Sequence, residues 1–243
     1  MEEKVIYEVL RVIDGKPIFL EAHIKRMKNS FKLVGQEFPL KFEEIRAKIR
    51  ELVKKENKTI GNIKITYGLN SRELKIFFIP HSYPTDEMYE KGVKTIFYFG
   101  ERSNPNAKIV NDDFRNKVNE EISRNNAYEA ILVDRNGFIT EGSKSNVFMV
   151  KGNELITSPA KAVLPGVTRG EIIELAHNIG VSVREEEYSY DDIDKLDGMF
   201  ISGTSPKVLP INSVGEIKLN PKNDVIKKLL DEYNSAMKKY IEN

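Results

Sequence analysis

The chain has 243 residues, 40% of them apolar, which is enough to fill the core of one large domain or two small ones. Its 38 Lys and Arg nearly cancel its 37 Asp and Glu, so the net charge does not point to nucleic acid or an anionic membrane as a partner. No apolar run could span a bilayer or act as a leader, so no membrane partner is expected. It has no cysteine, which excludes disulfides and fits a cytoplasmic chain. Its three histidines match no metal-binding spacing, so no metal site is predicted. The expected partners are small molecules.

Residues 1–100 are predicted to form a small α/β domain. The turn Asp14-Gly15-Lys16 joins two β-rich segments in a hairpin, and Asn70-Ser71-Arg72-Glu73 joins two more. Between the hairpins, apolar side chains recur at helical spacing over two segments. The predicted strands are 4–12, 17–20, 62–69, 74–79 and 93–99, the predicted helices are 21–33 and 42–53, and 81–92 is expected to be irregular.

Residues 101–107 have the composition of a linker, and we predict that they lead into a larger, strand-rich domain over 108–243. Its sequence alternates short apolar and β-branched segments with turn residues, and it ends in an amphipathic helix. The predicted strands are 129–133, a strand from Phe138, 147–150, 154–157, 181–186, 199–202 and 208–214, and the predicted helices are 112–125, 168–179 and 224–241. The predicted fold class is therefore α+β in two domains.

Three polar segments of the second domain are candidates for a binding site. Residues 140–146 place the carboxylate of Glu141 in a turn of small polar residues, although their composition also describes an ordinary loop. Residues 164–171 open a helix, with Thr168 and Glu171 spaced as a capping box. A helix start can hold a phosphate, but a side-chain cap would already satisfy some of its donors. Residues 200–205 carry a strand into a hydroxyl-rich turn where a backbone could approach an anion.

Together, in this order and near this spacing, these segments resemble the fold-type IV pyridoxal phosphate enzymes. That group of class IV aminotransferases includes D-amino acid and branched-chain aminotransferases and 4-amino-4-deoxychorismate lyase. The resemblance implies a small N-terminal α/β domain and a larger strand-rich cofactor-binding domain. It runs from about Val5 to Ser213 and also rests on Tyr7-Glu8-Val9-Leu10-Arg11, Gly15-Lys16-Pro17, His23-Ile24-Lys25-Arg26-Met27, Lys108-Ile109-Val110-Asn111 and Tyr128-Glu129-Ala130-Ile131-Leu132.

Carried onto this sequence, the resemblance implies that Lys108 holds pyridoxal 5′-phosphate as a Schiff base and then moves the proton at the substrate's α-carbon. Glu141 would face the pyridine nitrogen, Arg26 would bind the phosphate through its fork of donors, and Tyr7 would contact the substrate. Taken alone, Lys108 and Arg26 would pass for ordinary surface charges. The other implied cofactor contacts are Ser145, Asn146, Leu164, which would press on one face of the ring, Val167, Thr168, Gly203 and Thr204.

The resemblance implies amino acid and 2-keto acid substrates and leaves two reactions open. A transaminase releases a keto acid and aminates a second one, whereas the lyase releases pyruvate and 4-aminobenzoate. The spacing Lys108-x-x-Asn111 resembles the D-amino acid transaminases and the lyases, but the Arg-x-His pair of the former is missing from 66–72. We predict a class IV aminotransferase, with 4-amino-4-deoxychorismate lyase as the alternative and a catalytically silent cofactor-binding protein as a third.

The resemblance also implies a homodimer with each active site near the subunit interface. The family's usual opening, about twenty residues with a leading hairpin, precedes the Tyr7 motif and is missing here. We expect this difference to alter the substrate entrance or the subunit interface.

Overall fold

The computed structural model describes residues 3–102, 105–110 and 112–242, which form two compact units. The first unit contains residues 3–82, 107–110 and 236–242, and the second contains 83–102, 105–106 and 112–235. Helices and two sheets occur together, which confirms the α+β class. The domain division at 101–107 stays a prediction, and positions 103, 104 and 111, the last being the Asn of the Lys108 motif, lie outside the described residues.

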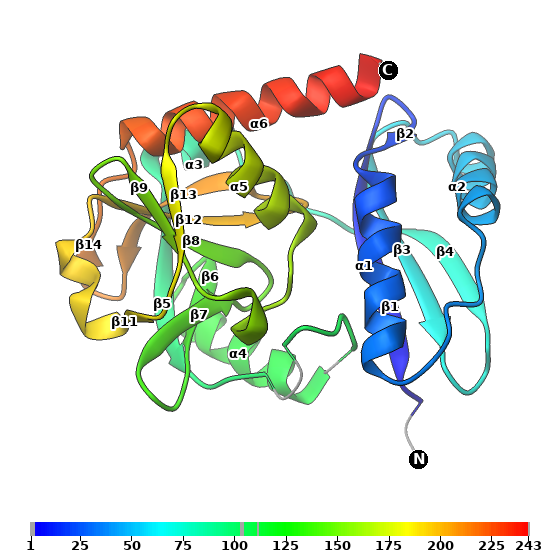
Figure 1. The fold of residues 1–243 in the computed structure, drawn as a ribbon, viewed down its shortest axis with the longest axis horizontal. Coiled ribbons are helices and arrows are strands. Elements are labelled where there is room, and N and C mark those ends of the chain that lie inside the picture. The colour runs from blue at the N-terminus through cyan, green and yellow to red at the C-terminus, as the bar shows by residue number, and fades with distance from the viewer. Residues whose placement is uncertain (1–2, 103–104, 111, 243) are drawn as a thin grey trace. The chain divides into compact units, whose positions relative to one another are not determined.

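The first unit is built on one antiparallel sheet with the strand order β2-β1-β3-β4 (Figure 1). Its elements are β1 (Val5–Ile13), β2 (Lys16–Pro17), α1 (Leu20–Leu33), α2 (Phe42–Glu56), β3 (Gly61–Gly68) and β4 (Leu74–Ile79). Successive side chains of a strand point to opposite faces, so Ile6 and Leu10 share one face of β1 and enter a core with Met27 and Phe31 of α1. Tyr7 lies on the opposite face of that strand.

The chain enters α1 earlier than the sequence predicted, because it turns at Phe19. The predicted strand 17–20 is limited to β2, and Phe19, the N-cap residue of α1, has a left-handed backbone with φ 52° and offers no side-chain cap. The backbone N–H of Leu20 instead donates to the hydroxyl of Tyr240 at 3.1 Å, and the rings of Phe19 and Tyr240 lie 5.1 Å apart. A residue from the last helix of the chain therefore satisfies a donor at the start of α1.

The second unit contains a mixed sheet with the strand order β10-β9-β8-β12-β13-β5-β6-β7-β11, and β14 pairs with β13. The pairs β10–β9, β13–β5 and β5–β6 are parallel. The strands are β5 (Val93–Phe99), β6 (Glu129–Val133), β7 (Phe138–Gly142), β8 (Asn146–Lys151), β9 (Glu154–Thr157), β10 (Ser182–Glu185), β11 (Tyr188–Ser189), β12 (Gly198–Gly203), β13 (Lys207–Val214) and β14 (Ile217–Lys218).

Four α-helices and two short 3-10 helices accompany these strands. They are α3 (Asp86–Lys91), α4 (Asp112–Arg124), α5 (Val167–Asn178), α6 (Asp224–Glu242), η1 (Ala160–Ala162) and η2 (Tyr190–Lys195), and the last turns of α6 belong to the first unit. The prediction that 81–92 is irregular was wrong at α3, which begins where Thr85 accepts a hydrogen bond from the N–H of Met88. This helix has six residues and none is buried, so it leaves no apolar pattern in the sequence. Among the described residues, no helix is long and apolar enough to cross a membrane.

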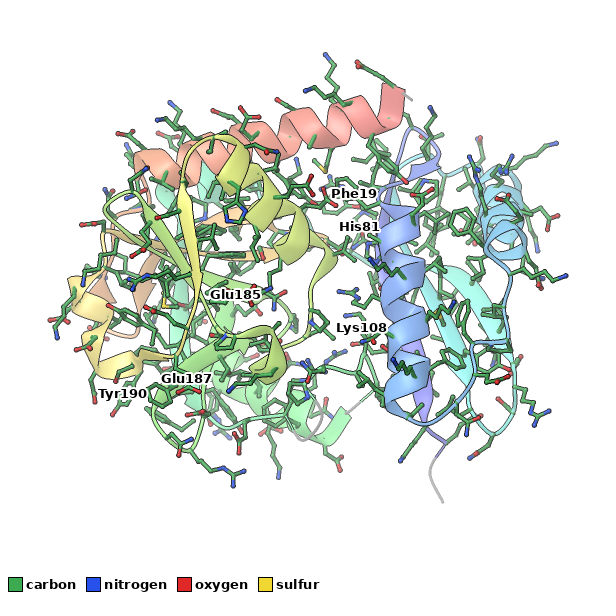
Figure 2. All side chains as sticks on the ribbon, in the orientation of Figure 1. Phe19, His81, Lys108, Glu185, Glu187 and Tyr190 are labelled. Carbon is green, nitrogen blue, oxygen red and sulfur yellow. The ribbon has the colours of Figure 1, made fainter. Side chains whose placement is uncertain are left out.

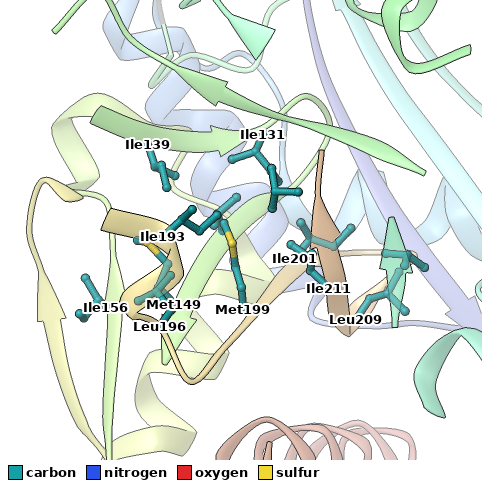
Figure 3. Packing of buried hydrophobic residues seen from close by; sticks show 13 residues of the cluster. Ile131, Ile139, Met149, Ile156, Ile193, Leu196, Met199, Ile201, Leu209 and Ile211 are labelled. Carbon is teal, nitrogen blue, oxygen red and sulfur yellow. The ribbon is translucent and has the colours of Figure 1, made fainter. Parts of the chain in front are cut away.

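Both faces of the β8–β12 pair are buried, which explains the continuous apolar runs of these strands. Phe148 and Phe200 pair across the strands, with their rings stacked at 11° and 5.0 Å between centroids. Met149 and Met199 pair next to them and belong to the core cluster drawn in Figure 3. The sheet that carries the polar turns of the second unit is therefore fixed by packing on both sides.

We predict that Phe200→Ala lowers the free energy of unfolding by about 3–5 kcal/mol, because it leaves a cavity in a fully buried layer. The matched change Phe99→Ala, at a ring that is 64% exposed, should cost less than about 1.5 kcal/mol. Urea denaturation followed by circular dichroism measures both. Equal losses in the two variants would contradict this description of the core.

Candidate active site

Lys108 is fixed to β1 by its backbone. The N–H of Tyr7 donates to the carbonyl of Lys108 at 3.1 Å, and the N–H of Val110 donates to the carbonyl of Val5 at 3.2 Å. The N–H of Lys108 donates to Ser30 Oγ at 3.3 Å, and that hydroxyl donates to the carbonyl of Arg26 at 3.2 Å. The segment therefore pairs with the strand that carries the Tyr7 motif and is tied by Ser30 to the helix that carries Arg26. Figure 2 shows Lys108 beside α1.

The ring of Tyr7 lies beside the amine of Lys108. Lys108 Nζ is 4.8 Å from the ring centroid, and Lys64 Nζ, on the neighbouring strand β3, is 5.0 Å from it. Tyr7 is 6% exposed, so these contacts are partly shielded from water. Such shielding strengthens the attraction between an ammonium group and an aromatic face. The predicted catalytic lysine and the predicted substrate-contacting tyrosine are thus brought together within the first unit.

Arg26 is held by Glu8, the residue after Tyr7. Arg26 Nε donates to Glu8 Oε1 at 2.9 Å and Nη2 donates to Oε2 at 2.6 Å, a bidentate pair whose carboxylate is fully buried. His23 Nδ1 lies 2.8 Å from Oε2, and because an ionised carboxylate only accepts, the ring nitrogen donates. Sequence reasoning gave Glu8 and His23 no role, although both lie inside the motifs that carry the resemblance.

Charge and burial act against each other on this cluster. Burial raises the pKa of the Glu8 carboxyl, but the Arg26 guanidinium and the His23 N–H outweigh it and bring that pKa to about 2. Burial lowers the pKa of His23 more than Glu8 raises it. His23 is therefore a neutral imidazole donor at neutral pH, and the ion pair of the cluster is the one between Glu8 and Arg26.

Glu141, the last residue but one of β7, is a buried carboxylate with both oxygens engaged. Arg102 Nη1 donates to Oε1 at 3.1 Å and the N–H of Leu164 donates to Oε2 at 3.0 Å, which joins two predicted site residues directly. Glu141 is 4% exposed and lies in a cavity of about 440 Å³. Arg102 was missed by sequence reasoning, because a single arginine in a linker-like segment carries no local signal.

A second buried carboxylate, Glu129, shapes the turn after Glu141. It accepts hydrogen bonds from the N–H of Lys144 at 2.6 Å and from Ser145 Oγ at 2.9 Å, and burial raises its pKa. A Cβ at Gly142 would lie 2.6 Å from Glu129 Oε1, so only glycine leaves room for this arrangement. The signal for Glu129 was visible in the sequence as an acidic residue at the head of an otherwise apolar strand.

The start of α5 differs from the predicted capping box. Gly166 is the N-cap, it provides no side-chain cap, and Thr168 lies inside the helix, where its hydroxyl is 3.4 Å from that of Tyr233. The capping-box prediction was therefore wrong, and the helix start lacks the side-chain acceptor that it invoked. Asn146 packs against this turn: its Nδ2 donates to the carbonyl of Leu164 at 2.9 Å, and a Cβ at Gly166 would lie 2.0 Å from its Oδ1.

The third polar segment begins beside Asn146, because Ser202 on β12 pairs with Asn146 on β8. Gly203 ends β12, and Thr204 follows in the turn. Ser202 is 1% exposed, and its Oγ has no hydrogen-bond partner among the described residues. A buried hydroxyl without a partner costs free energy, so this atom is an unsatisfied polar group next to the turn at Gly203 and Thr204.

Comparison with known proteins identifies the family of the chain. The profile of the family "Amino-transferase class IV" matches residues 5–214, so the chain belongs to the class IV aminotransferases, a family of pyridoxal phosphate-dependent enzymes. A Methanocaldococcus jannaschii protein with a provisional assignment as a branched-chain-amino-acid aminotransferase is 30% identical, over 97% of this chain and 88% of that protein. The D-alanine aminotransferase of Bacillus licheniformis is 27% identical, over 86% of this chain and 78% of the enzyme.

A solved structure confirms the fold. A Legionella pneumophila protein with a provisional assignment as a 4-amino-4-deoxychorismate lyase superposes with a TM-score of 0.85 at 22% identity, covering 95% of this chain and 90% of that one. At this identity the likeness shows the fold alone. The two relatives above that match by sequence are named for different substrates, branched-chain amino acids and D-alanine.

The Glu8 cluster predicts a pH dependence of stability. Because the pKa of Glu8 is about 2 in the folded chain against a usual 4.5, its stabilising contribution is complete above pH 4.5 and is lost as the pH falls toward 2. Glu8→Gln should lower the free energy of unfolding at neutral pH by about 3 kcal/mol, because it leaves Arg26 buried without its carboxylate, and should flatten the acid limb. Urea denaturation across this range measures it, with exposed Glu73→Gln as control. Parallel pH profiles for Glu8→Gln and the unaltered chain would contradict the assignment.

Proposed function

We propose that this chain is an aminotransferase that moves an amino group between an amino acid and a 2-keto acid, with Lys108 as its catalytic lysine. The observation that carries the proposal is the placement of Lys108, whose backbone is held by β1 and Ser30 and whose amine lies against the ring of Tyr7. A lysine that performs covalent and proton-transfer chemistry needs such a fixed position.

The residues present fit pyridoxal 5′-phosphate. The donor set is of the right kind: an amine for its aldehyde, a carboxylate for its ring nitrogen, and an arginine with a helix start for its phosphate. The unpartnered hydroxyl of Ser202 and the absence of a side-chain cap at Gly166 support an anion near the 203–204 turn. When bound, the cofactor supplies an electron sink for negative charge at the substrate's α-carbon.

Each proposed residue then has a defined task. Lys108 would move the proton from the substrate's α-carbon to the cofactor carbon that carried the aldehyde, while Tyr7 contacts the substrate beside that amine. Arg26 binds the phosphate. Because its Nε and Nη2 already donate to Glu8, the phosphate would have to bind the remaining N–H groups of the guanidinium. Glu141 accepts from the protonated ring nitrogen, and Leu164 covers one face of the ring.

The remaining proposed contacts surround the phosphate end. Val167 and Thr168 would offer the backbone N–H groups of the first turn of α5, and Gly203 and Thr204 would offer the turn after β12. Asn146 would hold the turn before α5, because its side chain binds the carbonyl of Leu164, and Ser145 would hold the turn after β7, because it binds Glu129. We also propose a homodimer, as the resemblance to the family implies, and a cytoplasmic location, which the absence of cysteine fits.

Activity assays separate the alternatives. We expect the purified chain with cofactor to transfer amino groups from a panel of D- and L-amino acids, including branched-chain and acidic ones, to 2-keto acids. Release of 4-aminobenzoate from 4-amino-4-deoxychorismate without transamination would instead establish the lyase. Bound cofactor with neither activity would establish the silent binding protein.

We predict that Lys108→Ala lowers the transamination rate at least about 10³-fold, because it removes the group that moves the α-proton. Lys75→Ala, at an exposed lysine of β4, should leave the rate unchanged. A stopped assay for the keto acid product measures both rates. Retention of full activity in Lys108→Ala would overturn the assignment of the catalytic lysine.

A further inference from the structure

The proposed role of Glu141 depends on whether its buried carboxyl group is ionised. This carboxylate is nine-tenths or more buried, and burial disfavours the ionised form of a carboxyl group. The proposed task of Glu141, accepting from a protonated ring nitrogen, requires the ionised form before the cofactor arrives. Something in the chain has to keep Glu141 charged and oriented.

The other charged groups around the cavity have partners of their own. Glu101 pairs with Arg135, and Asp134 Oδ1 accepts from the N–H groups of Asn136 and Phe138 within its own turn. Glu129, on the neighbouring strand β6, is a further buried acid and adds no positive charge. The other residues of β7 are uncharged.

Arg102 places a cation directly on Glu141, with a side chain only 18% exposed. Its Nη1 reaches Oε1 at 3.1 Å, while the N–H of Leu164 holds Oε2 at 3.0 Å. Two donors from two different segments fix both oxygens, so the plane of the carboxylate is set as well as its charge.

We infer that Arg102 is a positioning residue that keeps Glu141 ionised and oriented to receive the ring nitrogen of the cofactor. The inference rests on the proposed function and adds to it a residue outside the predicted cofactor set. Without Arg102, a buried Glu141 takes up a proton as the pH falls, and it then no longer balances the charge of a protonated ring nitrogen. Arg102 thus makes cofactor affinity less sensitive to pH.

The test is a titration of the cofactor-free full-length chain with pyridoxal phosphate, followed by its absorbance, at about pH 8 and about pH 6. The quantity of interest is the dissociation constant of each variant relative to the unaltered chain at the same pH, so that the titration of the cofactor itself cancels. The variants are Arg102→Gln, Arg102→Lys, Glu141→Gln and the double variant Arg102→Gln with Glu141→Gln. Arg135→Gln is the matched control, because its arginine lines the same cavity but pairs with Glu101.

For Arg102→Gln we expect the relative dissociation constant to rise about 10-fold or more between pH 8 and pH 6, because a buried carboxyl that has lost its cation takes up a proton more readily as the pH falls. Arg102→Lys should restore most of the affinity at the lower pH, and Arg135→Gln should match the unaltered chain. In the Glu141→Gln background, replacing Arg102 should add no pH effect, since the coupling needs both partners.

The opposite results overturn the inference. A relative dissociation constant for Arg102→Gln that is the same at both pH values, or a pH effect that persists without Glu141, would show that Arg102 acts only on the fold. Should Arg102→Gln fail to fold, as judged by circular dichroism, Arg102→Met removes the same charge and replaces it in the test. If the unaltered chain binds no pyridoxal phosphate, the proposed function fails and this inference fails with it; if it binds and only the Arg102 effect is missing, the proposed function stands.

Discussion

The pairing of residues 107–110 with β1 is the constraint on which the account depends. These residues follow the polar segment after β5 in sequence, yet their hydrogen bonds go to Val5 and Tyr7, about a hundred residues earlier. Ser30 adds a third contact by accepting from Lys108 and donating to Arg26. One backbone segment therefore brings the proposed catalytic lysine to the strand that carries Tyr7 and Glu8 and to the helix that carries Arg26.

Two buried carboxylates show how the chain manages charge away from water. Glu8 and Glu141 each face an arginine, Arg26 and Arg102, and each also accepts a further hydrogen bond. A buried carboxylate without such a partner would be costly, and removing one member of a pair leaves the other charge uncompensated. Glu129 differs, because the hydrogen bonds that it accepts come from a backbone N–H and a hydroxyl, and burial raises its pKa. The partners thus differ: an arginine faces Glu8 and Glu141, whereas Glu129 holds the backbone of a turn.

Much of the fold could be predicted from the sequence because its periodicity is strong. The helices at 21–33 and 42–53 and the hairpin around residues 70–73 occur within one to three residues of their predicted bounds. The failures are local and have physical causes: α3 is too short and exposed to leave a pattern, and Phe19 turns the chain through a backbone conformation that its residue type does not indicate. The Thr168 capping box failed because Gly166 begins the helix first.

The candidate site was predictable only in part, and for a different reason. The motifs led to Lys108, Arg26 and Glu141, but their partners Ser30 and Arg102 come from segments whose composition is ordinary, and contacts between distant segments leave no mark on local sequence. The roles of all these residues come from likeness to a family, whereas the geometry shows which of them touch. The substrate is the least defined part, since relatives of similar identity are named for branched-chain amino acids and for D-alanine.

The most direct measurement is chemical. The purified chain is incubated with pyridoxal phosphate, its visible spectrum is recorded, and borohydride reduction is followed by mass spectrometry of the proteolytic peptides. The account predicts a yellow protein with one pyridoxyl group on the peptide that contains Lys108. A protein that takes up no cofactor, or one labelled on another lysine, would contradict it.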